Sequence, residues 1–298
     1  MSKVLVTGGA GFIGSHLVDR LVDDGHDVIV LDNLSTGKRE NVNRGAKLIE
    51  CDIGDYEAIK AHFDKIDVVF HTAALARIQP SIKNPLPYNQ TNITGTLNVL
   101  WAAKNAGVKK VIYSASSSAY GDQEKFPLTE DMIPRPKTPY SIQKFVGELY
   151  CRLFSQLYGL PTVCLRYFNV YGPRQILVGA YAAVIGIFLW QIANGEPMTV
   201  VENGKQIRRD FTYISDVVEA NILAWQRDVG GGEIFNIGTG KNYAIHEVAE
   251  MIGGEIATIP ARPGDALITL AENAKVRKIL GWEPKVSLAE GIAKLKAL

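Results

Sequence analysis

Short runs of β-branched and other apolar residues alternate with longer amphipathic stretches along the first half of the chain. Such alternation is typical of parallel strands joined by helical crossovers. The predicted strands cover residues 3–7, 27–32, 47–52, 68–72, 110–114 and 162–167, and the predicted helices cover 12–23, 56–63, 92–106 and 141–157. The pattern therefore predicts an α/β protein with a doubly wound parallel sheet.

The pattern loosens after Tyr167, where glycine and proline interrupt the apolar runs. One more strand is predicted over residues 233–237, and helices are predicted over 181–194, 214–226, 245–252 and 271–280. We expect this part of the chain to form a smaller C-terminal α/β lobe that closes over the carboxyl edge of the sheet.

Composition excludes several classes of function. With 298 residues, 47% of them apolar, the chain can bury a large core. Its formal charge of +1 provides no field for nucleic acid or an anionic membrane. The apolar stretch 176–192 is interrupted and too short to span a bilayer, so we expect it to be buried. The apolar run near the start is too short for an export signal, and three separated cysteines, Cys51, Cys151 and Cys164, favour a reduced, cytoplasmic setting without a metal site.

A glycine-rich segment, TGGAGFIGSHL, joins the first predicted strand to the first predicted helix. Gly8, Gly11 and Gly14 permit a tight turn, close approach to a pyrophosphate, and close packing of helix on strand. The pyrophosphate would lie at a helix N-terminus. Asp32 ends the second predicted strand, where a carboxylate can accept both ribose hydroxyls and would repel the 2′-phosphate of NADP. The segment predicts an NAD site, although Asp32 could instead form a turn before Asn33.

Tyr140 and Lys144 lie four residues apart at the start of a predicted helix, and therefore on one face. A phenol becomes a base near neutral pH only if cations stabilise the phenolate, and an ammonium one turn away can contribute to that. A cluster of serines, Ser114 and Ser116 to Ser118, follows the fifth predicted strand and could bond a reacting hydroxyl. Taken alone, Tyr140 and Lys144 could be an ordinary surface pair. The serine cluster could be a polar loop that caps the next element.

Together these motifs resemble those of the extended short-chain dehydrogenase/reductase family, and within it the UDP-hexose 4-epimerases. The resemblance covers nearly the whole chain. It rests on TGGAGFIGSHL, LDNLS, HTAA, Asn92, SSSAYG, PYSIQK, RYFNVYGPRQ, RRDFTYISDV, NIGTG and RPGD. It implies a Rossmann-type NAD-binding domain over residues 1–167, with a returning segment near 210–240, and a mainly substrate-binding lobe over 168–298. It also implies NAD as cofactor, a UDP-sugar substrate, and a homodimer formed by the helices beginning near Asn92 and Tyr140.

The resemblance implies a role for each matched position. Ser116 is implied to be the catalytic hydroxyl, Tyr140 the base and Lys144 its activator. The residues implied to contact NAD are Gly8, Gly11, Phe12, Ile13, Gly14, Asp32, Asn33, Ser35, Gly37, Asp52, Ile53, Thr72, Ala73, Ala74, Asn92, Ser114, Tyr140, Lys144, Tyr167 and Phe168. The residues implied to contact the substrate are Ser116, Ser117, Ser118, Tyr140, Asn169, Ala183, Val184, Arg209, Arg262, Asp265 and Thr269. For Asp52 and Asn92 a helix cap is the alternative.

The implied reaction passes through a transient 4-keto sugar and returns hydride to the opposite face, so that NAD ends unchanged. It would interconvert UDP-glucose and UDP-galactose. Related dehydratases and decarboxylases place an acidic residue soon after the catalytic hydroxyl, where this chain has Ser117, Ser118 and Ala119. The reaction is therefore expected to stop at epimerisation. The alternatives are a dehydratase or reductase on a nucleotide sugar, and an NAD-sensing regulatory protein.

Three positions bear on the choice of sugar. Thr269 stands where glucose-restricted relatives tend to have a bulky tyrosine, so we expect UDP-GlcNAc and UDP-GalNAc to be accepted too. Arg77 follows HTAALA and either lies at the surface, which we expect, or meets a carboxylate, which would indicate UDP-uronic acids. Residues 176–178 form an unusually apolar segment where relatives usually have Asp-Pro.

Overall fold

The computed structural model describes residues 1–179, 182–260 and 266–298. Its central sheet consists of β1 (Lys3–Thr7), β2 (Asp27–Asp32), β3 (Lys47–Glu50), β4 (Val68–His71), β5 (Lys110–Ser116), β6 (Thr162–Tyr167) and β11 (Glu233–Ile237). These seven strands are all parallel and lie in the order β11-β6-β5-β4-β1-β2-β3. The predicted doubly wound α/β fold is confirmed.

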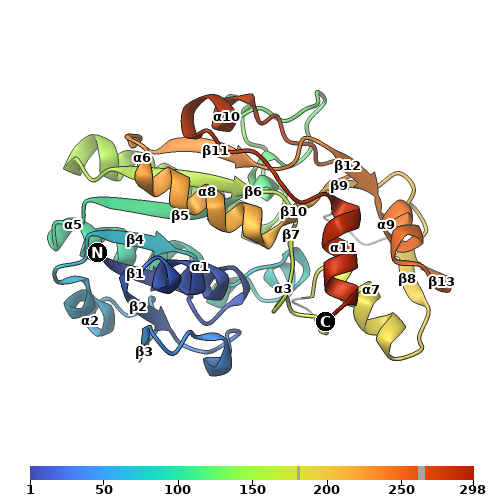
Figure 1. Cartoon of the computed structure of the whole chain (residues 1–298). Helices are drawn as coiled ribbons and strands as arrows, with labels where there is room; N and C mark the ends of the chain where they lie inside the picture. Colours follow the sequence, from blue (N-terminus) through green and yellow to red (C-terminus); the bar gives the residue numbers. More distant parts are fainter. Residues whose placement is uncertain (180–181, 261–265) are drawn as a thin grey trace.

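Both faces of the sheet are apolar, because its strands are covered by helices on both sides. Val4 and Val6 of β1 pack in one buried cluster with α1 (Phe12–Asp23) and α8 (Ile214–Gln226). Leu5 points the other way, into a second cluster with α2 (Tyr56–Ile59), α5 (Thr96–Asn105) and α6 (Pro139–Tyr158). Figure 1 shows α1 and α8 in front of the sheet.

Helix α6 begins at a well-defined cap. The Thr138 hydroxyl accepts a hydrogen bond from the Ser141 backbone N–H at 3.3 Å, and the Ser141 hydroxyl accepts one from the Thr138 N–H at 2.9 Å. Pro139 occupies the first turn, where its missing N–H costs nothing. The helix ends at Gly159, whose φ of 67° is the left-handed conformation that glycine adopts freely.

Short elements connect the main ones. Helices α3 (Ile78–Lys83) and α4 (Pro85–Asn89) and the π-helical turn η3 (Gln90–Gly95) lie between β4 and α5. Short 3-10 turns are η1 (Arg39–Asn41), η2 (Lys60–Phe63) and η4 (Ser117–Tyr120).

The C-terminal lobe is built from short helices and two-stranded sheets. Its elements are β7 (Val170–Tyr171), α7 (Val184–Ala193), β8 (Met198–Val201), β9 (Arg208–Asp210), β10 (Thr212–Tyr213), β12 (Asn242–Ala244), α9 (Ile245–Ile252), β13 (Ile256–Ile259), α10 (Ala274–Leu280) and α11 (Leu288–Lys296). The pairs are β10 with β7, β12 with β9, and β13 with β8. The cluster that holds Val4 continues into this lobe through Tyr171, Phe188 and Trp282, so the two parts share a core.

Most predicted elements are present, and the differences lie at their ends. Strand β5 continues to Ser116, so Ser114 and Ser116 belong to the strand rather than to the loop after it. The pattern did not predict α3, α4, α11 or the short lobe strands. The expectation that residues 176–192 are buried throughout is wrong, because Leu177 and Val178 are 41% and 54% exposed.

Within the described part of the chain, no helix has the length and apolarity to cross a membrane. The same residues contain no group of His, Cys, Asp and Glu that could hold a metal ion. Cys51, Cys151 and Cys164 are free thiols.

The close packing of α1 on β1 gives a test of the fold. A Cβ at Gly14 would lie 2.2 Å from the Gly8 carbonyl oxygen, whereas one at Gly11 would lie 3.2 Å from it. We predict that Gly14→Ala lowers the free energy of unfolding by about 1–3 kcal/mol, because the backbone must move apart. Gly11→Ala is the matched control, with a much smaller loss. Urea denaturation measures both, and equal stability of the two variants would contradict the prediction.

Candidate active site

A cavity of about 930 Å³ opens at the carboxyl ends of the parallel strands. Its wall on the sheet side comes from the loops that follow β1, β2, β4 and β5 and from the first turns of α6. Its opposite wall comes from the lobe, including residues of α7, β8 and β9. Ligands of open parallel sheets bind at this edge.

The glycine loop forms one end of the cavity. Gly8 has a φ of 73°, and the Gly11 N–H donates to the Gly8 carbonyl at 3.1 Å, which closes a tight turn before α1. The Asp32 carboxylate accepts from the Ala10 N–H at 2.9 Å and from the Leu34 N–H at 2.8 Å. Burial raises the pKa of Asp32, and the two backbone hydrogen bonds oppose that rise. No side chain caps α1, so its N-terminal dipole is available to an anion.

His71 supports this end of the cavity from beneath. One ring nitrogen lies 2.7 Å from the Thr7 hydroxyl and the other lies 3.0 Å from the Thr96 hydroxyl. Burial lowers the pKa of His71 to about 3, so the ring is neutral at physiological pH. The histidine therefore links β1, β4 and α5 and serves as a structural group.

Tyr140 and Lys144 line the other end of the cavity from the first turns of α6. The Lys144 ammonium donates to the Ser114 carbonyl at 2.8 Å and lies 5.0 Å from the centre of the Tyr113 ring. Burial lowers the pKa of Lys144 to about 8, with Cys151 and Glu148 opposing that shift. Lys144 is thus a cation that can lose its proton in the range where many enzymes work.

The environment of Tyr140 contains opposing influences. Burial raises the pKa of its hydroxyl, while a hydrogen bond with Ser116 and the positive charge of Arg77 lower it. Ser116 ends β5, and its hydroxyl also accepts a hydrogen bond from the Ser118 N–H at 3.2 Å. Ser116 and Tyr140 therefore present two hydroxyls to the same part of the cavity.

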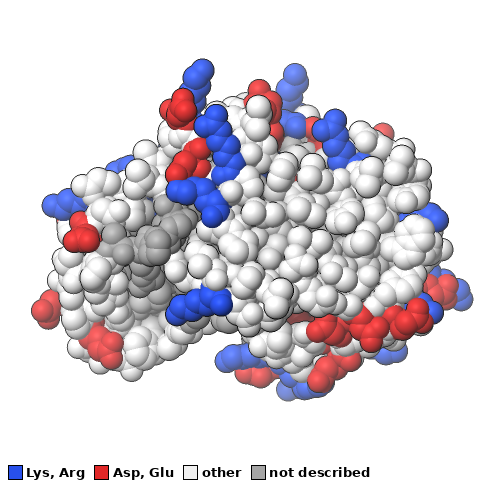
Figure 2. Space-filling model, turned by 180° about the vertical axis from the view of Figure 1, so that it is seen from behind, with Lys and Arg blue, Asp and Glu red and all other residues white. Residues whose placement is uncertain are grey.

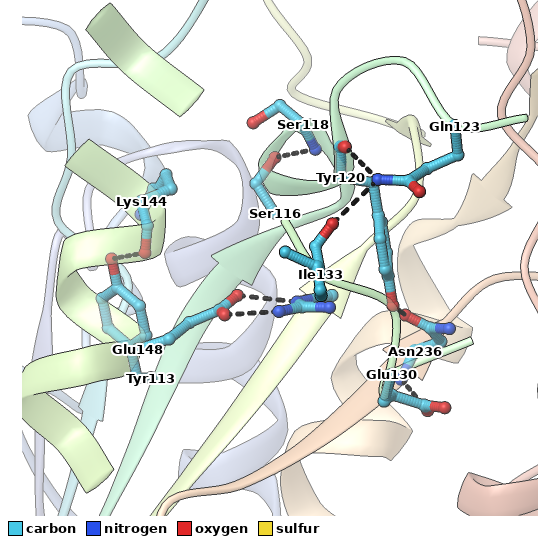
Figure 3. Close-up of polar contacts among 11 residues, drawn as sticks. Tyr113, Ser116, Ser118, Tyr120, Gln123, Glu130, Ile133, Lys144, Glu148 and Asn236 are labelled. Carbon is cyan, nitrogen blue, oxygen red and sulfur yellow. Dashed lines mark hydrogen bonds and ion pairs between the residues drawn. The ribbon is translucent and has the colours of Figure 1, made fainter. Parts of the chain in front are cut away.

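A buried ion pair ties α6 to the sheet (Figure 3). Arg166 of β6 donates through Nε and Nη2 to both carboxylate oxygens of Glu148, at 2.8 and 2.7 Å, and each side chain is 1% exposed. The guanidinium lies 4.5 Å from the centre of the Tyr120 ring, and the Tyr120 hydroxyl donates to Asn236 at 2.7 Å. Because Tyr120 ends the turn that follows Ser116, this network holds α6 and the serine turn in one arrangement.

The lobe side of the cavity is held by hydrogen bonds across its strands. The Asn169 amide donates to the Asp210 carbonyl at 2.7 Å and to the Thr269 hydroxyl at 3.1 Å. That hydroxyl also accepts from the Asp210 N–H at 3.2 Å. Arg209 donates to the carbonyls of Arg208 and Leu267, at 3.0 and 3.1 Å, and lines the cavity.

The sequence of residues 4–238 matches the model of the "NAD dependent epimerase/dehydratase family". The chain belongs to this family. The match spans the glycine loop, the serine turn and the Tyr140–Lys144 pair, which the fold brings to one cavity.

Individual members of the family are similar over almost their full length. The UDP-glucose 4-epimerase of Mycolicibacterium smegmatis is 39% identical over 98% of this chain and 96% of its own. The structure of a UDP-glucose 4-epimerase from Thermotoga maritima with UDP-glucose has a TM-score of 0.93, at 43% identity and with 97% and 96% of the two chains covered. A UDP-N-acetylglucosamine 4-epimerase from Methanobrevibacter ruminantium, in complex with UDP-N-acetylmuramic acid, has a TM-score of 0.92 at 38% identity, with 99% and 98% covered.

Most residues predicted for the site line the cavity, although their contacts with ligands stay predictions. On the sheet side these are Gly8, Gly11, Phe12, Ile13, Gly14, Asp32, Asn33, Ser35, Ile53, Thr72, Ala73, Ala74, Ser114, Ser116, Ser117, Ser118, Tyr140, Lys144 and Tyr167. On the lobe side they are Asn169, Ala183, Val184, Arg209 and Thr269. Arg262 and Asp265 lie outside the described residues.

Four predicted cofactor contacts do not line the cavity. Asn92 is 1% exposed, and its amide accepts from the Leu75 N–H and donates to the Leu75 carbonyl, both at 2.9 Å. Phe168 is fully buried. Both side chains are buried in this structure, and their contacts with a cofactor stay predictions.

Gly37 and Asp52 are likewise absent from the cavity lining. A Cβ at Gly37 would meet the Ala10 backbone at 2.8 Å, so this glycine lets one loop pack on another. Asp52 accepts from the Asn33 amide at 2.9 Å and from the Gly54 N–H at 2.7 Å. Asp52 does not cap α2 either, because Asp55 does so.

The expectation that Arg77 lies at the surface is wrong, because Arg77 is partly buried and lines the cavity. Other lining residues were not predicted either, among them Arg174 and Gln175. Arg174 forms an ion pair with Asp19 at 2.7 Å. Gln175 is 6% exposed, and neither polar atom of its amide has a hydrogen-bond partner. Both belong to the RYFNVYGPRQ segment. The length of this motif was the sequence signal that could have identified them as site residues.

Proposed function

We propose that this protein is an NAD-dependent UDP-hexose 4-epimerase, which interconverts UDP-glucose with UDP-galactose and UDP-GlcNAc with UDP-GalNAc. The observation that carries the proposal is one cavity lined at one end by the glycine loop with Asp32, and at the other by Ser116 with Tyr140 and Lys144. The similarity to UDP-sugar 4-epimerases over nearly the whole chain supports the same reaction.

The residues present fit NAD. The uncapped start of α1 and the glycine loop suit a pyrophosphate, and Asp32 suits the adenosine ribose because its oxygens retain lone pairs after two backbone hydrogen bonds. When bound, NAD would accept hydride from sugar C4 and return it.

The chain's own residues handle the proton and the orientation of the sugar. Tyr140 removes the proton of the 4-hydroxyl and later returns it, while the Ser116 hydroxyl bonds the same oxygen. Because burial raises the pKa of Tyr140, the reaction needs cations close to the phenol, and Lys144 one turn away provides one of them. Arg209 suits the UDP diphosphate, which then holds the nucleotide in place while the sugar turns over.

The scarcity of carboxylates among the described lining residues supports epimerisation over elimination. Among the described residues that line the cavity, the only carboxylate is Asp32, at the glycine loop. The serine turn offers hydroxyls where an eliminating enzyme needs a proton donor to the leaving group.

The direct test is to incubate the purified protein with UDP-glucose, UDP-galactose and their 2-acetamido counterparts and to read the C4 configuration by NMR. We expect both epimers to form without net NADH. Tyr140→Phe should lower kcat at least about 100-fold, since it removes the acid–base group and keeps the ring. Formation of a 4-keto-6-deoxy sugar, or full activity of Tyr140→Phe, would contradict the proposal.

Thr269 gives a test of sugar preference. Its side chain is 9% exposed and lines the cavity. We predict that Thr269→Tyr lowers kcat/KM for UDP-GlcNAc by about 10-fold or more relative to UDP-glucose, because the larger ring takes up space beside the sugar. Thr269→Ser, which keeps the hydroxyl and the small size, is the control. If the ratio of kcat/KM for UDP-GlcNAc to that for UDP-glucose is unchanged in Thr269→Tyr, the small size of residue 269 is not what admits the acetamido group.

We also propose a homodimer formed through α6 and its neighbours. Ile142, Leu149, Leu153 and Leu157 of α6 are 47%, 51%, 41% and 64% exposed and recur at helical spacing. Figure 2 shows the side of the molecule opposite α1 and α8, with a broad area free of charged side chains. Exposed apolar side chains along a helix favour a partner that covers them.

Sedimentation velocity tests the dimer. The wild type should sediment as a dimer, and Leu149→Lys with Leu153→Lys should sediment as a monomer, because two buried charges would face the partner. Met251→Lys, at a residue of α9 that is 42% exposed, is the control for an added charge elsewhere. A monomeric wild type at micromolar concentration would refute this interface.

A further inference from the structure

Two sequence motifs, RRDF and NIGTG, meet next to residues that line the lobe side of the cavity. RRDF supplies Asp210, the last residue of β9, and NIGTG covers residues 236–240, where β11 ends. Asp210 is fully buried and is absent from the cavity lining. Its carboxylate can therefore influence a ligand only through the groups that it holds in place.

Four hydrogen-bond donors surround this carboxylate. One of its oxygens accepts from the Thr239 N–H at 2.8 Å and from the Thr239 hydroxyl at 2.7 Å. The other oxygen accepts from the Gly240 N–H at 3.0 Å and from the Ala271 N–H at 3.1 Å. Burial raises the pKa of Asp210, and these four hydrogen bonds oppose the rise. Since hydrogen bonds to a charged acceptor are stronger than neutral ones, the carboxylate firmly joins two segments that are distant in sequence.

The glycines of NIGTG make room for the carboxylate. A Cβ at Gly238 would lie 3.0 Å from an Asp210 carboxylate oxygen and 2.4 Å from the Ala271 side chain. Gly240 has a φ of 74°, a conformation that glycine adopts freely. Successive backbone N–H groups in a turn can form a concave anion-binding site. In this turn the anion is a side chain of the same chain.

Asp210 also connects the turn to three side chains of the cavity wall, those of Asn169, Arg209 and Thr269. The Asp210 carbonyl accepts from the Asn169 amide at 2.7 Å, and the Asp210 N–H donates to the Thr269 hydroxyl at 3.2 Å. Arg209 precedes Asp210 in β9 and donates to the Leu267 carbonyl at 3.1 Å. The segments that carry these three side chains are thus joined around one buried carboxylate.

The serine side of the cavity is held by other bonds. The Tyr120 hydroxyl donates to Asn236 at 2.7 Å, and the Lys144 ammonium donates to the Ser114 carbonyl at 2.8 Å. Figure 3 shows Tyr120 and Asn236 beside the turn that follows Ser116. None of these bonds involves the Asp210 carboxylate, so its loss leaves them intact.

We propose that Asp210 is a positioning residue for the UDP part of the substrate, and that its carboxylate sets the places of Asn169, Arg209 and Thr269 by binding the NIGTG turn and Ala271. The inference rests on the proposed epimerase function and adds a residue that does not line the cavity. Arg209 can present paired donors to a diphosphate only if β9 is correctly placed. A displaced wall weakens binding of the nucleotide in the ground state and the transition state alike, which raises KM and leaves kcat.

The experiment measures the Kd for UDP by titration calorimetry, and kcat and KM for UDP-glucose, in the wild type and in Asp210→Asn. Asparagine keeps the size of the side chain, but it loses the charge and turns an NH₂ group toward N–H donors. Asp210→Asn should raise both the Kd for UDP and the KM by about 10-fold or more and change kcat by less than about 3-fold.

Asp216→Asn is the matched control. Asp216 is a carboxylate of α8 that is 3% exposed, accepts from the N–H groups of Lys285 and Val286, both at 3.1 Å, and is absent from the cavity lining. Its variant should lower the free energy of unfolding in urea and leave Kd and KM unchanged. If Asp210→Asn does not fold, Thr239→Val, which removes one donor to Asp210, should raise Kd and KM by about 3-fold. Thr239→Ser, which keeps the hydroxyl, should behave as the wild type.

Several results would overturn the inference. One is a folded Asp210→Asn variant with unchanged Kd and KM, or with a loss of kcat as large as that of kcat/KM. Another is an equal rise of KM in Asp216→Asn, and a third is a Thr239→Ser variant that matches Thr239→Val. If the wild type binds UDP and epimerises no UDP-sugar, the proposed function fails, and the Kd for UDP still decides the role of Asp210. A wild type that does not bind UDP would contradict both.

Discussion

All strands of the main sheet run in the same direction, and the site of this protein depends on that constraint. Parallel strands end at one edge, so the loops after β1, β2, β4 and β5 meet there although they are far apart in sequence. At that edge the backbone of the glycine loop is free to bind an anion, and the hydroxyls at the end of β5 face the first turns of α6. The lobe closes the opposite side and turns an open edge into a cavity.

The buried pair of Arg166 and Glu148 sets how α6 lies on that edge. Removing two charges from water is costly, so such a pair is weak evidence for stability, whereas loss of one partner typically costs about 3–5 kcal/mol. Its two hydrogen bonds and the stacking of Arg166 on Tyr120 fix the orientation of α6 on the sheet as well as its distance from β6. The helix that carries Tyr140 and the turn that follows Ser116 are therefore held by the same guanidinium.

Electrostatics distinguish the two ends of the cavity. At the glycine loop an acidic residue and an uncapped helix N-terminus lie together, a combination that suits hydroxyls and phosphates. At the other end, Lys144 and Arg77 line the cavity together with Tyr140, whose pKa is raised by burial and lowered by the charge of Arg77. A buried phenol near a positive charge suits proton transfer.

The sequence by itself determined the class of fold and the local chemistry, because these follow from periodicity and from short segments. The helix over residues 12–23 and the strand over 233–237 agree with the prediction, and Tyr140 and Lys144 lie four apart whatever surrounds the helix. Only the tertiary structure decided which side chains reach the cavity. Arg77 lines it, while Asn92 and Phe168 are buried behind it, because that outcome depends on how α3, η3 and β6 pack against elements distant in sequence. Hydrophobic periodicity records which face of an element is buried, and it contains no information about which neighbour covers that face.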